Sequence, residues 1–464
     1  MSNKHAKKAY TRAIAEYVCE TRFSDLPQEA VACAKLHLLD AIGIMLGAYG
    51  AKHELIRSLI ELVTESCGDG QATIVGSGEK ATYPDVVMTN SVMANFLDFS
   101  DGHFRGGHIN DRLVPVALAA AERVGASGKD LVTALVLGYE VYIDLASTLF
   151  GTVEPTSTRS PYFVILGALS GVVPAGKLFG LDVEQLAGAL GLAASVQLTG
   201  AQYVVSGGHE KDLTVGHESR RAILSALIAE KGILGSRDIL EGQRGVFNVL
   251  DAKPELPTGL GEHYRIVECY FKPYPACRFL HASIEATMNL KKEYDIPIAE
   301  IEKVTVRTNT SSSRRASYVI SSHVHAIFSH PYQVATVLID GHPSLPICWQ
   351  EKTRHPLFDA LLHRIEMVAD PKYEAMFQRR SLEQPPWPAE VEVITRDGKS
   401  YRSEVLSPKG DPTNPLTPDE VRDKFSRLTE GVLTAARQAE ILETVEHLEE
   451  LADVADLVKL LVVS

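Results

Sequence analysis

The segment YFKPYPACRFLH, residues 270 to 281, combines positive charge with a stiff backbone. It contains Lys272, Arg278 and His281, and its two prolines fix φ and push the residues before them toward extended conformations. A helix is predicted to begin near Arg278, and preorganised cations near a helix start suit a carboxylate. We therefore expect Lys272 and Arg278 to bind an acidic substrate. The alternative is a loop with a solvent-facing basic cluster.

A second segment, residues 90 to 115, places Asp98, Asp101, His103 and His108 in a short glycine-broken stretch. A polar loop after a helix of small residues is a common location for catalytic groups. A metal site would use His103, His108 and one aspartate, but the spacing does not match HExxH or a comparable zinc motif, and no metal ligand is predicted. The alternative is a solvated loop whose aspartates cap helices.

A third segment, residues 204 to 232, has His209 and Lys211 after two glycines and before a helix that carries Arg220 and Arg221. Glycine lets the backbone approach a ligand closely, and a helix N-terminus adds its positive end. The spacing matches neither GxxxxGK[ST] nor GxGxxG after a strand, so no phosphate-binding loop is predicted. An ordinary capped helix is the alternative.

The elements that must position these groups are helical up to about residue 265. A representative helix follows Asp25, the expected cap, and stops at Gly50. After residue 266, residues 301 to 309 alternate like a strand, and residues 389 to 405 read as two strands joined by a turn at Asp397 and Gly398. A helical tail is predicted from Pro418, with Thr417 as its cap, and we expect it to pack on the first domain. The expected fold class is mainly α, with a large all-helical domain and a smaller α+β domain.

The composition is typical of a globular enzyme with two domains: 464 residues, of which 45% are hydrophobic and 23% charged. A net charge of −13 argues against nucleic acid or an anionic membrane surface as a partner. The six cysteines form no CxxC pair, which favours reduced thiols in the cytoplasm. No signal peptide is recognised, and the longest apolar run, Leu38 to Ala48, is far short of a membrane span.

Together these segments resemble the MmgE/PrpD family. The resemblance covers nearly the whole chain and is carried by NSVMANFLDFSD, GKLFGLD, the Lys211 loop, GILGSRDILEGQRGVF, KPYPACRFLH and FSHPYQVATVLIDG, in that order. It implies a helical domain made of residues 1–266 together with 412–464, a lid domain at 267–411, a homodimer, and a site between the domains. It also implies action on small di- or tricarboxylic acids without a metal or organic cofactor.

By motif position, the resemblance implies five catalytic residues, which are Asp98, His108, Lys211, His281 and Tyr332. Further substrate contacts are expected from His103, Arg112 and Arg159, in addition to Lys272 and Arg278.

This chain departs from the family pattern at several places. Many members carry HPS where this chain has His108, Ile109 and Asn110, and small residues where it has Arg220 and Arg221. The common LDFDD reads LDFSD, with Ser100 at the fourth position. A further family histidine falls in RSPYF, residues 159 to 163, which contains none, and we expect Arg159 or Tyr162 to fill its place. These departures argue against a citrate-type substrate.

The expected chemistry is proton transfer at a carbon next to a carboxylate. Lys211, Lys272 and Arg278 would meet the charge that builds on the carboxylate oxygens. His108 and His281 are the candidate acid and base, with Asp98 as an orienting group or a base and Tyr332 as a donor.

Three reactions can follow from this chemistry: dehydration, epimerisation and decarboxylation. A dehydratase resembling 2-methylcitrate dehydratase is favoured. An epimerase of a dicarboxylic acid or a cis-aconitate-type decarboxylase is the alternative, and a non-catalytic organic-acid binding protein is the alternative of another class.

Overall fold

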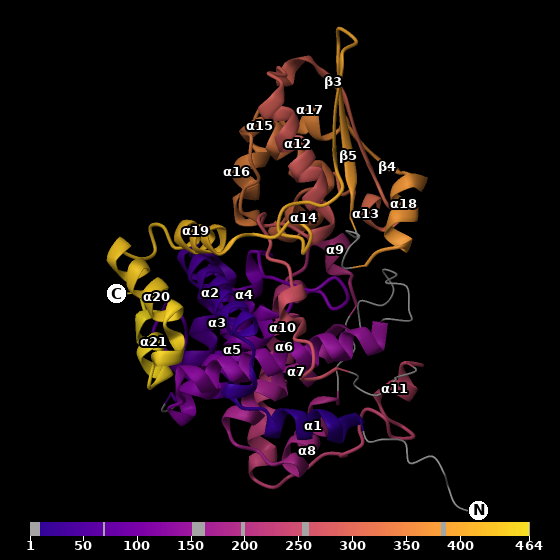
Figure 1. Ribbon diagram of the computed structural model, residues 1–464. Coiled ribbons are helices and arrows are strands. Elements are labelled where there is room, and N and C mark those ends of the chain that lie inside the picture. Colours follow the sequence, from indigo (N-terminus) through magenta and orange to yellow (C-terminus); the bar gives the residue numbers. More distant parts are fainter. Residues whose placement is uncertain are drawn as a thin grey trace, which may run out of the picture.

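In a computed structural model of the chain, a broad helical part carries a narrower part that contains the larger sheet (Figure 1). The structure describes residues 10–67, 70–150, 163–195, 200–252, 259–381 and 387–463. Helices dominate this part of the chain, and its strands form one two-stranded and one four-stranded sheet. The predicted fold class, mainly α with a smaller α+β domain, is confirmed.

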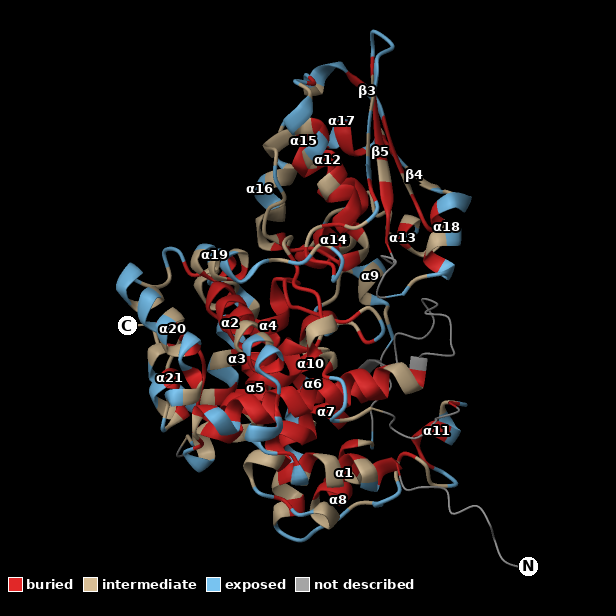
Figure 2. Ribbon diagram, in the orientation of Figure 1, coloured by how far each residue is buried: buried red, intermediate tan, exposed pale blue. Residues whose placement is uncertain are grey.

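The helical part combines the first half of the chain with its last helices. The bounds of its elements are α1 Tyr10–Glu20, α2 Gln28–Gly50, α3 Glu54–Glu65, β1 Ala72–Thr73, β2 Lys80–Ala81, α4 Tyr83–Phe96, α5 Asn110–Val124, α6 Gly128–Phe150, α7 Phe163–Leu178, α8 Val183–Ala193, α9 Tyr203–Ser206, α10 Glu210–Glu230, α11 Val246–Val249, α19 Pro418–Leu428, α20 Ala435–Glu446 and α21 Val454–Leu460. Helix α10 packs on α4 and α7, while α19 packs on α2 and α21 on α5. The central helices are buried and α20 is largely exposed, as Figure 2 shows.

Helices α2 and α6 are long and apolar enough to cross a membrane by length and composition alone. Their apolar windows are 78% and 89% buried inside the protein, respectively. A core helix surrounded by other helices has the same composition, so this finding is weak support for a membrane span.

The second part packs helices against a four-stranded sheet of order β4-β3-β5-β6. Strand β3 pairs in parallel with β4 and antiparallel with β5, and β5 pairs antiparallel with β6. Helix α12 packs on β5 and β6, and α15 packs on β4. The bounds of its elements are α12 His281–Glu293, β3 Ile301–Thr308, α13 Thr310–Ser313, α14 His323–Phe328, α15 His330–Asp340, α16 Trp349–Thr353, α17 Phe358–Leu362, β4 Ile365–Ala369, α18 Pro371–Gln378, β5 Ala389–Thr395 and β6 Ser400–Val405.

Most of the predicted elements are present, with two corrections. The strands at 301–309 and 389–405 are confirmed, and Gly398 takes a left-handed φ of 82° in the turn between the last two. Thr417 caps α19 as predicted, in a capping box with Glu420. Asp25 does not cap α2. Its carboxylate instead accepts the backbone N–H of Arg22, at the start of a short turn that precedes α2. The five-residue strand β4 was not predicted.

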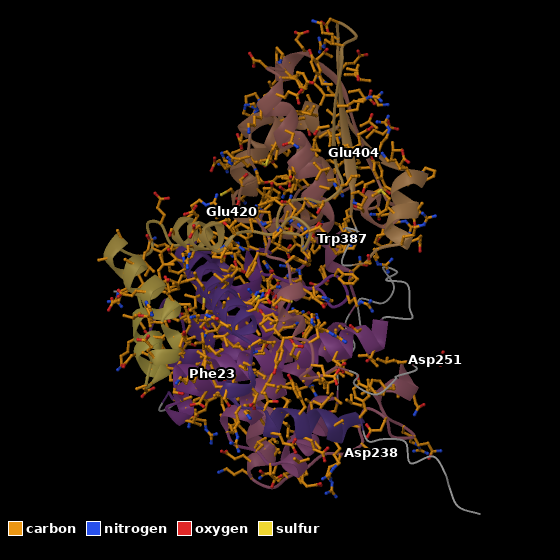
Figure 3. The ribbon with its side chains drawn as sticks, in the orientation of Figure 1. Phe23, Asp238, Asp251, Trp387, Glu404 and Glu420 are labelled. Atoms are coloured by element: carbon orange, nitrogen blue, oxygen red, sulfur yellow. The ribbon has the colours of Figure 1, made fainter. Side chains whose placement is uncertain are left out.

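The chain passes twice between the two parts, and the crossings bring distant loops together. On the way out, Tyr270 pairs with Gly102 in a short antiparallel bridge, with N···O distances of 2.8 and 3.1 Å. On the way back, Lys409 forms a 2.9 Å ion pair with Glu420, which Figure 3 labels on α19. We propose to keep the domain limits of 1–266 with 412–464 and 267–411, and we call the second part the lid domain.

The returning helix α19 also supports the loop that follows α4. Its Lys424 donates to the carbonyl oxygen of Phe99 at 2.7 Å, forms a 2.7 Å ion pair with Asp40, and lies 3.9 Å from the centre of the Phe99 ring. Both charged groups are buried, so the loss of either partner would leave an unpaired charge in the core. Helix α19 therefore fixes the backbone next to Asp98.

Candidate active site

Asp98 is the centre of a buried charge cluster. It follows the end of α4, is 2% exposed, and takes a left-handed φ of 49°, which is rare for a residue other than glycine. Its carboxylate lies 2.8 Å from Lys272 Nζ and 3.3 Å from Lys211 Nζ. Burial alone would raise the pKa of Asp98, but the charges of Lys272 and Lys211 lower it far below the usual range. Asp98 is therefore an anion that aligns two cations and a poor candidate for the base.

The two lysines differ in how firmly they hold their protons. Burial lowers the pKa of Lys272, and the nearby charge of Asp98 only partly opposes it. For Lys211 burial acts in the same direction, but Asp98 and Asp212 outweigh it and raise the pKa. Lys211 is thus a lasting positive charge, and Lys272 is the easier proton donor.

Lys272 also has one N–H without an acceptor among the described residues, on a side chain that is 0% exposed. Its Nζ donates to the side chain and to the carbonyl oxygen of Asp98, both at 2.8 Å. An ammonium group has three donors, so one remains. The two lysines face Asp98 together, and Asp212 lies 3.7 Å from Lys211 Nζ, so Lys272 is the cation with less negative charge around it and the one that suits a substrate carboxylate.

His108 is held as a neutral imidazole with one lone pair facing the cluster. Its Nδ1 lies 2.6 Å from Ser100 Oγ, whose hydroxyl donates to Asp111 Oδ2 at 3.3 Å. Ser100 must therefore accept the Nδ1–H of His108, which leaves the lone pair on Nε2, 3.9 Å from Asp98 Oδ1. Burial and the charge of Lys272 lower the pKa of His108 to about 4. The His108 side chain is 25% exposed, so it can contact a substrate.

The position of His108 is set by Asp101, the other aspartate of the LDFSD motif. Asp101 Oδ1 accepts the backbone N–H groups of Ile109 and Asn110 at 3.3 and 2.9 Å, where α5 begins. Its Oδ2 accepts the Tyr139 hydroxyl at 2.5 Å and lies 2.5 Å from His37 Nδ1. Asp101 is thus a buried cap that fixes the loop, which agrees with the structural alternative for this residue.

Arg278 and His281 form a separate pair beside the cluster, at the start of α12. Since a guanidinium has no acceptor, the 2.7 Å contact makes His281 Nδ1 the acceptor of the Arg278 N–H. His281 Nε2 then donates to the carbonyl oxygen of Ala276 at 3.1 Å. Burial and the charge of Arg278 lower the pKa of His281 well below its ordinary value. Both ring nitrogens are occupied, so His281 orients Arg278 and has no free position for acid–base work in this arrangement.

Family models match almost the entire chain. The MmgE/PrpD N-terminal domain matches residues 12–258, and the MmgE/PrpD C-terminal domain matches residues 274–450. The chain belongs to the MmgE/PrpD family. This confirms the resemblance found in the sequence motifs.

The curated relatives of this chain are enzymes whose names contain small organic acids. The chain is 24% identical over 472 residues to cis-aconitate decarboxylase of Aspergillus terreus. The aligned residues cover 96% of this chain and 94% of the relative. It is 22% identical to cis-aconitate decarboxylase of Homo sapiens, over 90% of this chain and 87% of the relative. It is 25% identical to the mitochondrial 2-methylcitrate dehydratase of Yarrowia lipolytica, over 78% of this chain and 72% of the relative.

Not every residue expected from the MmgE/PrpD pattern lies in the cluster. Among the described contacts, Asp98, His108, Lys211 and Lys272 come together, with Arg278 and His281 beside them. Tyr332 lies in the core of the lid domain, where its ring contacts Phe358 edge-on at 5.7 Å between centroids. Among the described residues, Tyr332 makes no hydrogen bond with the Asp98 cluster, and its catalytic role stays a prediction.

The remaining expected substrate contacts are occupied by protein partners or fall outside the described residues. His103 is 1% exposed and lies 3.3 Å from Glu268. Arg112 is paired with Glu218 at 2.7 Å and with Asp111 at 2.8 Å. Neither side chain is a free cation, and both strengthen the frame around His108. Arg159 and Tyr162 lie outside the described residues.

Three residues of the site were not predicted from the sequence. Ser100 was noted only as a departure from LDFDD, yet it fixes the tautomer of His108. Asp411, from the segment that returns to the helical domain, is the ion-pair partner of Arg278. His323 of α14 lies 2.9 Å from Asp212, the residue after Lys211. Asp411 and His323 are separated from their partners by more than a hundred positions, at which distance sequence spacing gives no signal.

The described residues do not support a metal site in the loop that follows α4. His103 and His108 have different partners, Glu268 and Ser100. One group of described side chains has metal-binding geometry, and it consists of His209, Asp212 and His323.

Proposed function

We propose that this protein is a lyase that acts on a small di- or tricarboxylic acid by proton transfer at the carbon next to a carboxylate, and that it is a dehydratase. One observation carries the proposal: a neutral His108 with its Nε2 lone pair directed toward a cluster in which Lys211 and Lys272 face Asp98. A base next to two ammonium groups is the arrangement that carbanion chemistry beside a carboxylate requires.

In the proposed reaction, His108 Nε2 takes the proton from the carbon next to the substrate carboxylate. The negative charge that spreads onto the carboxylate oxygens is met by Lys211, whose raised pKa keeps it charged. A carbon–carbon double bond forms as the bond to the β-hydroxyl breaks. Lys272, whose pKa is lowered, gives its proton to the departing hydroxyl, which leaves as water. His108 then holds the abstracted proton, and its transfer to the neutral Lys272 restores the enzyme.

Decarboxylation is the second candidate because of the relatives. The curated relatives that cover most of this chain include cis-aconitate decarboxylases. In that reaction the carbon–carboxylate bond breaks with loss of CO2, the remaining carbanion takes a proton from Lys272, and Lys272 regains a proton from water. The same side chains serve both reactions, so the substrate decides between them.

Four further parts of the proposal concern the setting of this chemistry. We propose that the proton transfer needs no metal or organic cofactor, that the protein binds a small organic acid but no nucleic acid or membrane, that it is a homodimer, and that it works in the cytoplasm. The cysteines support a reducing compartment, since Cys19, Cys33, Cys67, Cys269, Cys277 and Cys348 are all free thiols. Light scattering after size-exclusion chromatography would test the dimer.

The experiment for the reaction is proton NMR in D2O on metal-stripped protein with citrate, 2-methylcitrate, cis-aconitate, malate, tartrate and aspartate. Alkene signals from a hydroxy acid would support the dehydratase. Loss of a carboxylate from cis-aconitate would support the decarboxylase, and deuterium exchange without a new product would favour the epimerase. An unchanged spectrum with every acid, together with binding, would overturn the catalytic proposal in favour of an organic-acid binding protein.

A further inference from the structure

A second cluster of ionisable groups joins the two domains beside Lys211. His209 precedes α10 as its N-cap residue, Asp212 lies in the first turn of that helix, and His323 is the first residue of α14 in the lid domain. Asp212 Oδ2 lies 2.9 Å from His323 Nε2 and 3.3 Å from His209 Nδ1. One ligand atom from each of the three residues lies within 4.8 Å of the others.

The two distances from Asp212 Oδ2 fit the edges of a metal coordination shell, and the two histidine nitrogens lie within 4.8 Å of each other. Zinc binds imidazole nitrogen and carboxylate oxygen at about 2.0–2.2 Å, which places neighbouring ligands about 3.0 Å apart in an octahedron and about 3.4 Å apart in a tetrahedron. Two imidazoles and one carboxylate are a ligand set that first-row divalent metals accept. We propose that His209, Asp212 and His323 bind one zinc-class divalent cation that ties the lid helix α14 to α10.

A cation would have to displace the hydrogens that the cluster now shares. His209 Nδ1 and His323 Nε2 both lie within hydrogen-bond distance of Asp212 Oδ2, and metal binding at such a site releases protons. The side chain of Asp212 is fully buried, and its Oδ1 makes no hydrogen bond. Side-chain exposure of 51% at His209 gives a cation access from solvent.

A fourth histidine, His53, is near but does not complete the set. Its ring centre lies 5.6 Å from that of His323 and 6.4 Å from that of His209. Its Nδ1 accepts the backbone N–H of Leu55 at 3.2 Å, so the hydrogen of neutral His53 sits on Nε2 and this nitrogen has no lone pair to offer. Three protein ligands leave a position for water or for an anionic ligand.

A cation at this position would act on the proposed active site through Lys211. The Lys211 ammonium lies 3.7 Å from Asp212 Oδ1 and 3.3 Å from Asp98. A bound cation would share Asp212 with Lys211, weaken the hold of Asp212 on that ammonium, and fasten the lid domain over it. The role is accessory to the proposed proton transfer, and the binding inference does not depend on which acid is the substrate.

The test is calorimetric titration of ZnCl2 into the chelator-treated full-length protein, with zinc content measured after gel filtration. We expect one zinc ion per chain in the wild type. The variants are His209→Gln, Asp212→Asn and His323→Gln, and the matched control is His217→Gln, a histidine of the same helix outside the cluster. Loss of a ligand should weaken binding by more than the roughly 10- to 100-fold that loss of an outer partner costs, while the control should bind as the wild type does.

Thermal unfolding gives a second readout that does not use activity. Zinc should raise the Tm of the wild type and of His217→Gln, and should leave His323→Gln unchanged, because that variant has lost the ligand from the lid domain. His209→Gln changes a half-exposed side chain, so this variant should still fold. Absence of saturable zinc binding, or equal binding by the wild type and His209→Gln, would overturn the site without bearing on the dehydratase proposal.

Discussion

Lys272 and Asp98 are 174 positions apart in the sequence, and their charged groups lie 2.8 Å apart in the interior. Lys272 belongs to the segment that leaves the helical domain, and Asp98 to the loop after α4. Their ion pair therefore joins the two segments that the sequence singled out separately. Because both side chains are buried, their ion pair fixes the two segments relative to each other and balances the charge of each group.

Asp98→Asn should destabilise the protein. The substitution leaves the ammonium of Lys272 buried without its counter-charge, and breaking such a pair costs about 3–5 kcal/mol. Urea unfolding followed by circular dichroism measures the loss. The double variant Asp98→Asn with Lys272→Met should recover much of the stability, since no unpaired charge remains at that pair. Equal stability of Asp98→Asn and wild type would contradict the ion pair.

His108→Gln should lower kcat by about 10²- to 10⁴-fold, the usual contribution of a positioned base. Substrate binding should change little, because a neutral imidazole contributes little to holding a carboxylate. Turnover by NMR and binding by calorimetry separate the two effects. His217→Gln is the control. A variant that keeps its turnover but loses binding would remove His108 from the role of base.

The rate should stay high at unusually low pH. His108 must be unprotonated to act as a base, and its pKa is lowered to about 4. On acidification kcat/KM should therefore fall only near pH 4, and not near the ordinary histidine value of about 6.5. An acid limb near pH 6.5 in the wild-type profile would rule out this environment for His108.

Ser100→Asp should move that acid limb to higher pH. A carboxylate next to Nδ1 favours the imidazolium form and raises the pKa of His108, so protonation inactivates the base at a higher pH. Ser100→Ala, which removes the hydrogen bond and adds no charge, is the matched control and should not shift the limb upward. The measurement is kcat/KM against pH for both variants.

His281→Ala should affect substrate binding more than the chemical step. His281 accepts a hydrogen bond from Arg278 and holds that guanidinium against Asp411. Its loss should raise KM, while kcat and the shape of the pH profile should change little. Steady-state kinetics across pH is the measurement. A fall in kcat of about 100-fold or more, with loss of one limb of the profile, would restore His281 as an acid or base.

Local sequence patterns determined the elements and the segments that carry charge. Helix caps such as Thr417, the alternation of strand β3, and the turn at Gly398 depend on neighbouring residues only, so they could be read in advance. The Lys272 and Lys211 segments were recognised because cations next to glycines, prolines and helix starts have a local physical meaning. Family motifs then joined these segments into one expected site.

Only the tertiary structure decided what each side chain does there. His281 and His108 were both candidate acids or bases, but one has both ring nitrogens occupied and the other keeps a lone pair on Nε2. Asp98 was a possible base, until two buried lysines made its carboxylate a lasting anion. Protonation states and free lone pairs depend on partners from distant parts of the chain and on burial. The spacing of residues along the sequence therefore does not determine protonation states or free lone pairs.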